Sequence, residues 1–331
     1  MNLVAEWEKQ EFVQLVFPHE NTDWNDYLEE SIQTFVNIAI IISKYQKCLI
    51  IAKNLQEVKP LFSNKENLIF VEIDSDDTWS RDFGGITVRA NNQLTVLDFQ
   101  FNAWGNKFSY TLDNQITKHL KEKGMLTSYK YKSIPFVLEG GAIESNGAGV
   151  ILTTSKCLLE ENRNPDLNQY EIEKKLIEYL GAKKVLWLNS GYLEGDDTDS
   201  HIDTLARFIN EDTIVYQSCD DEMDIHYNEL KKMKQELTKF TQINGNKFNL
   251  IPLPWISAKY DGMERLPATY ANFLFINNAV LIPTYNDKND IKVLKLFEKL
   301  FPKKDVIAID CQTLIRQHGS LHCVTMQYPA L

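Results

Sequence analysis

The chain has 331 residues, of which 44% are hydrophobic and 24% are charged. This composition is that of a globular protein with a large core, and it excludes a disordered or collagen-like chain. Lys and Arg number 35 against 46 Asp and Glu, which gives a net charge of −11. Without a basic stripe, the chain is not expected to bind nucleic acid, and its negative field favours a cationic ligand.

Amphipathic helical patterns alternate with strand-like runs along the chain. The helices are predicted at residues 26–45, 112–123, 167–180, 223–240 and 290–301. A strand-like run follows each helix, at 47–52, 128–136, 184–188, 248–252 and 305–309. Further runs at 94–99, 150–154, 213–217 and 273–283 precede most of the helices.

This rhythm predicts an α/β fold built from five copies of one strand-and-helix unit, each about 55 to 80 residues long. A doubly wound sheet also alternates strands and helices, so periodicity alone does not separate the two architectures. The chain contains no glycine-rich phosphate loop of either standard type, which disfavours a nucleotide-binding sheet. Because no Pro-, Gly- or Ser-rich linker divides the sequence, we expect residues 1–331 to form a single domain.

The cysteines suggest a reducing environment. The chain has five, at positions 48, 157, 219, 311 and 323, and no pair has C-x-x-C spacing. This pattern predicts neither a disulfide framework nor a cysteine zinc cluster. The N-terminus lacks a signal-peptide pattern, and the apolar stretch at 36–42 is far shorter than the ~20 residues that span a membrane. We therefore expect a cytoplasmic protein with no membrane partner.

Five segments place reactive side chains beside glycine-rich or aromatic turns. They are residues 74–85, 138–144, 194–203, 266–273 and 318–325. Each follows a predicted strand in a successive unit. If the five units close into a ring, these strand ends meet and the segments share one pocket.

Two of these segments carry a candidate nucleophile and a candidate base. On an extended segment, the two-residue spacing of His201 and Asp203 directs both side chains to the same side. A histidine beside a carboxylate can act as acid and base near neutral pH. Cys323, with a distant histidine, has the sequence form of a thiol nucleophile, although a lone cysteine is more often a small buried residue. Cys48, Cys157, Cys219 and Cys311 lack such surroundings and are interpreted as core or surface thiols.

Three acids, Asp82, Glu139 and Asp203, would surround this thiol. Such a site repels an anion and accepts a guanidinium, whose N–H groups pair with carboxylates bidentately. The alternatives are an ion pair between Asp82 and neighbouring Arg81, and a turn position for Glu139. A metal site is not expected, because the chain has no H-E-x-x-H, no paired cysteines and no complete calcium loop.

Taken together, the motifs resemble those of the agmatine deiminase family, which is grouped with the bacterial peptidylarginine deiminases. They are WSRD at 79–82, EGG at 139–141, NRNP at 162–165, GDDTDSHID at 195–203, YANF at 270–273 and LHCVT at 321–325. The resemblance implies a single five-bladed α/β propeller of ββαβ units. It also implies cofactor-free and metal-free hydrolysis of agmatine to N-carbamoylputrescine and ammonia, a step toward putrescine.

The resemblance also assigns roles. Cys323 corresponds to the nucleophile, His201 to the general acid and base, and Glu139 to the acid that positions the guanidinium and the histidine. Asp82 and Asp203 correspond to the pair that grips the guanidinium, and Trp79 to an aromatic wall of the substrate channel. A packed core tryptophan is the alternative for Trp79.

Two departures from the family pattern lie beside the expected pocket. Residues 316–320 replace a glycine-rich run, and Ala142 stands where many members have Asn. Both leave the deimination chemistry unchanged but bear on the substrate's tail. Arginine and peptidylarginine are therefore kept as alternative substrates, and a non-catalytic guanidine- or polyamine-binding protein as a different class. The partner is expected to be a small cationic guanidine, and a homo-oligomer is compatible with the sequence.

Overall fold

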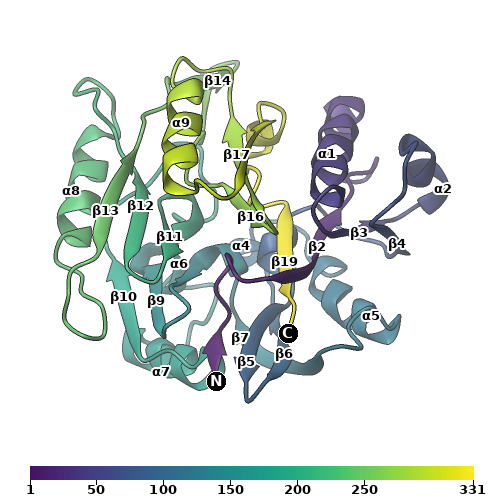
Figure 1. Cartoon of the computed structure of the whole chain (residues 1–331), viewed down its shortest axis with the longest axis horizontal. Coiled ribbons are helices and arrows are strands. Elements are labelled where there is room, and N and C mark those ends of the chain that lie inside the picture. The colour runs from purple at the N-terminus through teal and green to yellow at the C-terminus, as the bar shows by residue number, and fades with distance from the viewer.

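The computed structural model describes residues 1–331 as a mixed α/β fold. Figure 1 shows the longer helices distributed around the rim of the molecule. They are α1 (Leu28–Ser43), α5 (Ile116–Glu122), α7 (Gln169–Leu180), α8 (Tyr227–Leu237) and α9 (Asp290–Leu300). These five lie within the five predicted helical stretches.

The strands form six separate sheets. Two sheets have four strands each. In order across the sheet, the first consists of β1 (Asn2–Leu3), β5 (Ile86–Ala90), β6 (Gln93–Gln100) and β7 (Lys130–Val137). The second consists of β19 (Thr325–Pro329), β2 (Gln10–Val16), β3 (Lys47–Ala52) and β4 (Leu68–Glu72). Three have three strands: β10 (Lys184–Leu188), β9 (Val150–Thr154) and β8 (Ile143–Ser145); β11 (Ala206–Asn210), β12 (Thr213–Gln217) and β13 (Asn249–Leu253); and β16 (Leu274–Ile276), β17 (Ala279–Thr284) and β18 (Asp305–Asp310). The sixth is the hairpin of β14 (Lys259–Asp261) and β15 (Glu264–Leu266).

Five of these sheets share one connection. An antiparallel strand pair is followed by one of the five helices and then by a strand that adds parallel to the second strand of the pair. In the β16–β17–β18 sheet, Leu274 faces Leu281, and Ala279 faces Asp305 across the parallel pair. A parallel pair needs a crossover of this length, which accounts for the helix between β17 and β18.

The remaining short helices are α2 (Leu55–Val58), α3 (Ser80–Phe83), α4 (Ala103–Asn106) and α6 (Ser155–Leu158), with 3-10 turns η1 (Asn25–Tyr27), η2 (Lys59–Leu61), η3 (Asp113–Gln115), η4 (Gly140–Ala142), η5 (Ile202–Thr204) and η6 (Leu314–Gln317).

The structure differs from the predicted elements in two places. The run at 273–283 is a hairpin, β16 and β17, because Asn278 adopts a positive φ of 60° and reverses the chain. The segment at 74–85 does not directly follow the predicted strand at 47–52, since α2 and β4 lie between them. The strands that were not identified in the sequence are β1, β2, β4, β5, β8, β11, β14, β15 and β19.

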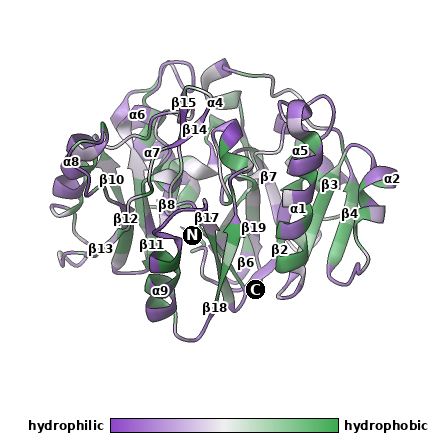
Figure 2. Ribbon diagram, turned by 90° about the horizontal axis from the view of Figure 1, so that it is seen from above, coloured by the Kyte–Doolittle hydropathy of each residue, from purple (hydrophilic) through white to green (hydrophobic).

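The helices bury one face each. In α1, Phe35, Ile38, Ala39 and Ile42 are fully buried, at the three- and four-residue spacing that places side chains on one face. Helix α7 begins with a capping box, in which Asn168 and Glu171 satisfy each other's backbone N–H groups. In Figure 2, β3 and β4 are coloured predominantly hydrophobic, whereas the loops around them are hydrophilic.

One antiparallel pair joins strands from opposite ends of the chain. β19 pairs antiparallel with β2, with Thr325 opposite Leu15 and Gln327 opposite Val13. This pairing holds residues 321–324 near the N-terminal segment, and Figure 1 shows both termini close together. None of the helices combines the length and apolar character that crossing a membrane requires.

Candidate active site

Cys323 lies in the turn between η6 and β19, and only 5% of it is exposed. Its Sγ is 3.3 Å from Nδ2 of Asn272 and 3.9 Å from Oδ2 of Asp203. The Asn272 Oδ1 accepts hydrogen bonds from the backbone N–H groups of His322 (2.8 Å) and Cys323 (3.3 Å). Asn272 therefore fixes both the backbone and the thiol of the candidate nucleophile.

Asp82 lies on the short helix α3 and is buried. Its Oδ1 accepts a hydrogen bond from the backbone N–H of Gly141 (3.0 Å), and its Oδ2 accepts one from Nε1 of Trp104 (3.0 Å). The Oδ1 atom is also 3.6 Å from Nδ1 of His201. Arg81, the alternative partner considered for Asp82, instead pairs with Glu6 at 3.1 Å.

Glu139 ends the β7 segment and pairs with a residue that carried no predicted role. Arg163 donates from Nε to Oε1 of Glu139 (2.8 Å), and both side chains are fully buried. The same guanidinium donates to Oδ2 of Asp199 (2.8 Å) and to the carbonyl of Thr198 (2.9 Å). Oε2 of Glu139 has no hydrogen-bond partner, so one carboxylate oxygen is held and the other is free.

Gly141 explains why the segment after Glu139 carries paired glycines. A Cβ at this position would lie 2.6 Å from Nδ1 of His201, 2.8 Å from Oδ1 of Asp82 and 3.1 Å from Oδ2 of Asp203. Three functional side chains from two other segments, 74–85 and 194–203, thus converge on one α-carbon. Any larger residue would displace at least one of them.

His201 is fully buried, and neither ring nitrogen has a hydrogen-bond partner. Burial lowers the pKa of His201, but the carboxylates of Asp82 and Glu139 and the thiol of Cys157 outweigh it, so the net pKa lies well above its ordinary value. The imidazole is therefore protonated at neutral pH. An unpartnered, protonated ring among carboxylates is available to deliver a proton to a bound ligand.

Asp203 follows His201 in η5 and is also fully buried. Its Oδ2 lies 2.7 Å from Nδ1 of His322, whereas its Oδ1 has no partner. Burial raises the pKa of Asp203. The hydrogen bond to His322 and the charge of His322 lower it by more than burial raises it, so the net pKa lies below its ordinary value. The carboxylate is ionised, with one oxygen held and one open.

Asp82 and Cys323 open into a cavity of about 150 Å³. Trp79 and Gly319 lie against each other in its wall, and a Cβ on Gly319 would fall 2.1 Å from the Trp79 ring. Trp79 is only 6% exposed and donates from Nε1 to Oδ2 of Asp77 (3.0 Å). The cavity is lined by Asp23, Asp77, Trp79, Asp82, Trp104, Phe108, Asp197, Thr198, Gln317, His318, Gly319 and Cys323.

Four aspartates line this cavity, and no lysine or arginine does. Burial raises the pKa of Asp82 and of Asp197 to about 6, so both are ionised at pH 7 and above. The four aspartates therefore make the wall of the cavity negative. Such a cavity attracts a cation and repels a carboxylate.

The thiol of Cys323 is neutral when the cavity holds only water. Burial and the nearby carboxylates of Asp203 and Asp82 raise the pKa of Cys323 well above its ordinary value. A cation placed between the thiol and these carboxylates would reverse this effect, because opposite charge favours the thiolate.

Two groups of side chains have ligand atoms within 4.8 Å of one another, as a metal ion would require: Glu139, Cys157 and His201, and Glu6, Glu144 and His322. In each group an arginine guanidinium, Arg163 or Arg207, already pairs with a carboxylate. These permanent cations oppose a second positive charge. Cys157 was interpreted as a thiol without reactive surroundings; it is buried, but it lies beside His201 and Glu139.

The structure thus brings together all six residues that the sequence singled out: Trp79, Asp82, Glu139, His201, Asp203 and Cys323. Asn272 and Arg163 stand in the quoted YANF and NRNP motifs, which was the available signal for them. Trp104, Glu6 and Cys157 belong to none of the quoted motifs. Only their contacts in the structure identify them.

Comparison with known proteins places the chain in a family. Residues 2–329 match the sequence profile of the Porphyromonas-type peptidyl-arginine deiminases. A putative agmatine deiminase of Mycoplasma capricolum subsp. capricolum is 31% identical over 98% of this chain and 94% of its own length. The chain therefore belongs to the Porphyromonas-type peptidyl-arginine deiminase family.

Solved structures agree with this assignment. A crystal structure described as a putative peptidyl-arginine deiminase has a TM-score of 0.97 and 48% identity, covering 99% of both chains. The C. jejuni agmatine deiminase, solved as a cysteine-to-serine variant with substrate bound, has a TM-score of 0.94 and 45% identity over 99% of this chain and 96% of its own. An amidinotransferase from Microseira wollei, at 11% identity and a TM-score of 0.56, shares the fold alone.

Proposed function

We propose that this protein is an agmatine deiminase, a hydrolase that converts agmatine and water to N-carbamoylputrescine and ammonia. The observation that carries this proposal is the cavity at Cys323, which four aspartates line without a lysine or arginine. Agmatine bears a guanidinium at one end and an ammonium at the other. Both ends are cationic and match a wall that carries four aspartates and no lysine or arginine.

Each predicted residue has a role that its contacts support. Asp203, whose Oδ2 is 3.9 Å from Sγ of Cys323 and whose Oδ1 is free, and Asp82, which lines the same cavity as Cys323, grip the guanidinium nitrogens. Glu139 offers its free Oε2 toward His201 and the substrate, while Arg163 holds the other oxygen. The Trp79 ring forms one wall for the substrate's methylene chain.

The bound guanidinium supplies the charge that activates the thiol. In the empty site the Cys323 thiol is protonated, because burial and two carboxylates oppose the thiolate. The guanidinium compensates those carboxylates and adds a positive charge next to Sγ. The nucleophile is thus formed only when substrate is present.

The reaction then proceeds in two halves. The Cys323 thiol first releases its proton to solvent. Sγ then bonds to the central guanidinium carbon, His201 gives its proton to one amino nitrogen, and the bond from carbon to that nitrogen breaks to release ammonia. Water next attacks the resulting thiouronium carbon and gives one proton to His201. The C–S bond breaks, the remaining hydroxyl proton passes to Sγ, the ureido product leaves, and Cys323 and His201 are regenerated.

The fold that we propose for this chemistry is a five-bladed, pseudo-symmetric α/β propeller formed by residues 1–331 as a single domain. Five sheets with the same strand–strand–helix–strand connection support it. The segments at 79–82, 139–141, 201–203, 270–273 and 321–325 lie between successive sheets and meet around His201 and Cys323. This arrangement is what a ring of five units would produce.

Ammonia release from the purified protein, measured with agmatine and with arginine side by side, tests this function. We expect agmatine turnover that Cys323→Ser abolishes while calorimetry still detects agmatine binding. Cys219→Ser, the same change at a partly exposed thiol away from the cavity, should leave the rate unchanged.

Other outcomes would replace this function. Preferential turnover of arginine or of a peptidylarginine would keep the thiol chemistry but overturn the assignment to agmatine. Agmatine binding without turnover in the wild-type protein would favour a guanidine-binding protein instead.

A further inference from the structure

A continuous chain of side chains leads from Asp203 away from the cavity. Nδ1 of His322 is 2.7 Å from Oδ2 of Asp203, and Nε2 of His322 is 2.8 Å from Oε1 of Glu6. His322 is fully buried and precedes the candidate nucleophile directly. A residue near the N-terminus is thereby connected to the carboxylate that faces the substrate.

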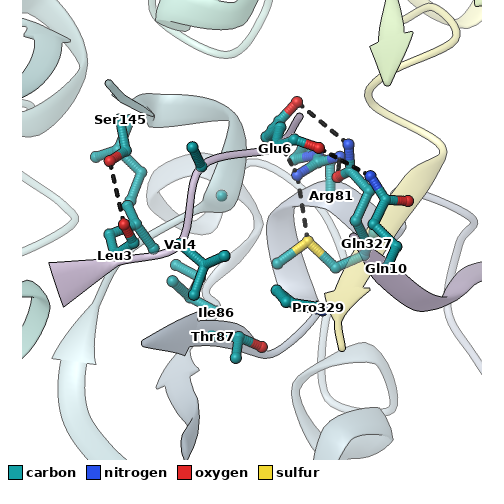
Figure 3. A pocket seen from close by; sticks show the side chains of 14 residues that line it. Leu3, Val4, Glu6, Gln10, Arg81, Ile86, Thr87, Ser145, Gln327 and Pro329 are labelled. Carbon is teal, nitrogen blue, oxygen red and sulfur yellow. Dashed lines mark hydrogen bonds and ion pairs between the residues drawn. The ribbon is translucent and has the colours of Figure 1, made fainter. Parts of the chain in front are cut away.

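Glu6, whose side chain is 22% exposed, is the centre of a cluster of charged side chains that are otherwise buried. It accepts hydrogen bonds from Nη1 of Arg81 (3.1 Å), from Nη2 of Arg207 and from Nε2 of Gln327 (3.2 Å). Figure 3 shows the Glu6 carboxylate directed toward Arg81 and Gln327, above a cavity of about 60 Å³ that is separate from the one at Cys323. Burial raises the pKa of Glu6, but His322, Arg207 and Arg81 outweigh it and hold the net pKa well below its ordinary value, so Glu6 is ionised.

Arg207 cannot leave this cluster. Its Nη1 donates to the carbonyls of Ala271 (3.1 Å) and Phe273 (2.9 Å), and its Nε pairs with Glu144. The guanidinium is close enough to lower the pKa of Asp203. If Glu6 lost its charge, the positive charges of Arg207 and Arg81 would remain in place without the Glu6 carboxylate to compensate them. They would then offset part of the negative potential of the Asp203 carboxylate.

We propose that Glu6 is a positioning residue of this site. It acts through His322 and Arg207, keeping one oxygen of Asp203 held and leaving the other, with its full charge, for the guanidinium. This inference rests on the proposed deiminase function. Because the guanidinium is cationic before and during the reaction, losing Glu6 should weaken binding and leave the chemical step largely intact.

The test is Glu6→Gln, which removes the charge and keeps the shape. We expect its KM for agmatine to rise about tenfold while kcat stays within twofold. In the Cys323→Ser background, the Kd for agmatine measured by calorimetry should rise by a similar factor. The matched control is Glu8→Gln in the same segment, whose carboxylate pairs with Arg89 and has no contact with His322; it should change neither constant.

A second variant keeps the inference testable if Glu6→Gln fails to fold. In His322→Asn, the amide can still donate to Asp203 but cannot reach Glu6, so the same rise in KM is expected. An unchanged KM in folded Glu6→Gln would overturn the inference. A lower kcat at unchanged KM would also overturn it, because that result indicates a merely structural loss of active protein. If Glu6→Gln does not fold, unchanged KM in His322→Asn overturns it. Wild-type protein without agmatine turnover would overturn the proposed function itself, and this inference with it.

Discussion

Arg163 and Glu139 form an ion pair in which neither side chain is exposed to solvent, with Nε 2.8 Å from Oε1. The two residues come from the segments after β9 and β7, and the pair leaves Oε2 of Glu139 free beside His201. A buried pair of this kind contributes little net stability when intact, but it leaves an uncompensated charge when one partner is removed. Its value to the protein is the fixed direction of the Glu139 carboxylate.

Removing the arginine should therefore cost both stability and activity. We expect Arg163→Met to lower the free energy of unfolding by about 3–5 kcal/mol, because Glu139 is left buried and unpaired. Urea denaturation measures this difference. The control, Arg89→Met, breaks the partly exposed pair with Glu8 and should cost less than about 1 kcal/mol. Equal losses in the two variants would contradict this account of the buried pair.

The activity should fall in acid because of Asp82. Burial raises the pKa of this carboxyl to about 6, so it is half ionised near that pH and loses its remaining charge as the pH falls further. We expect kcat/KM for agmatine to fall about tenfold per pH unit below the midpoint. Asp197 titrates in the same range, and Asp197→Asn should leave the Asp82 limb in place.

A Trp104 variant tests whether Asp82 is the group that causes the loss of activity in acid. Its Nε1–H donates to Oδ2 of Asp82 and favours the ionised carboxylate. Trp104→Phe should therefore move the acid midpoint of kcat/KM to higher pH, and a downward shift or no shift would be inconsistent with it.

A folded-state pKa above the unfolded value means that protonation of Asp82 favours folding. Acid loss of activity at this site should then occur without a fall in Tm caused by this group.

Gly141 should tolerate no side chain. The Cβ of Gly141→Ala would lie within 3.1 Å of atoms of His201, Asp82 and Asp203. Since displacements of about 1 Å at a reacting site can cost about a hundredfold, we expect kcat/KM to fall by at least that factor. Gly262→Ala adds the same methyl group at a surface turn, where no atom lies within 4 Å, and should leave the kinetic constants unchanged. A Gly141→Ala enzyme with near wild-type kinetics would refute the convergence described here.

We expect Asp197 to select for the ammonium tail. Asp197 lines the cavity, and burial raises its pKa to about 6, so that it becomes ionised as the pH rises through that value. Asp197→Asn should raise the KM for agmatine about tenfold, which is the effect of losing about 1.4 kcal/mol of attraction. The KM for butylguanidine, which has the same guanidinium and no ammonium, should not change. An equal change for both guanidines would place Asp197 at the guanidinium end, and Asp220→Asn, at an exposed acid, serves as the control.

Local sequence pattern determined much of this protein. Four strands, 47–52, 150–154, 184–188 and 213–217, have the predicted bounds, because their apolar runs are flanked by turn residues that end them. The five longer helices lie within the predicted stretches because their apolar residues recur at helical spacing. The motifs around Asp82, Glu139, His201, Asp203 and Cys323 were visible for a similar reason: reactive side chains stand beside glycines within a few residues.

Tertiary structure alone decided which distant groups meet. Glu6 precedes Cys323 by more than 300 residues, and no periodicity or motif connects them; the pairing of β19 with β2 brings them together. Cys157 resembled an inert core thiol until its position beside His201 was known. An ion pair between Arg81 and its neighbour Asp82 was the alternative considered from the sequence, but Arg81 pairs with Glu6, and Asp82 accepts hydrogen bonds from Trp104 and Gly141. Sequence spacing constrains only side chains on the same element, whereas the partners of a buried charge depend on how separate elements pack.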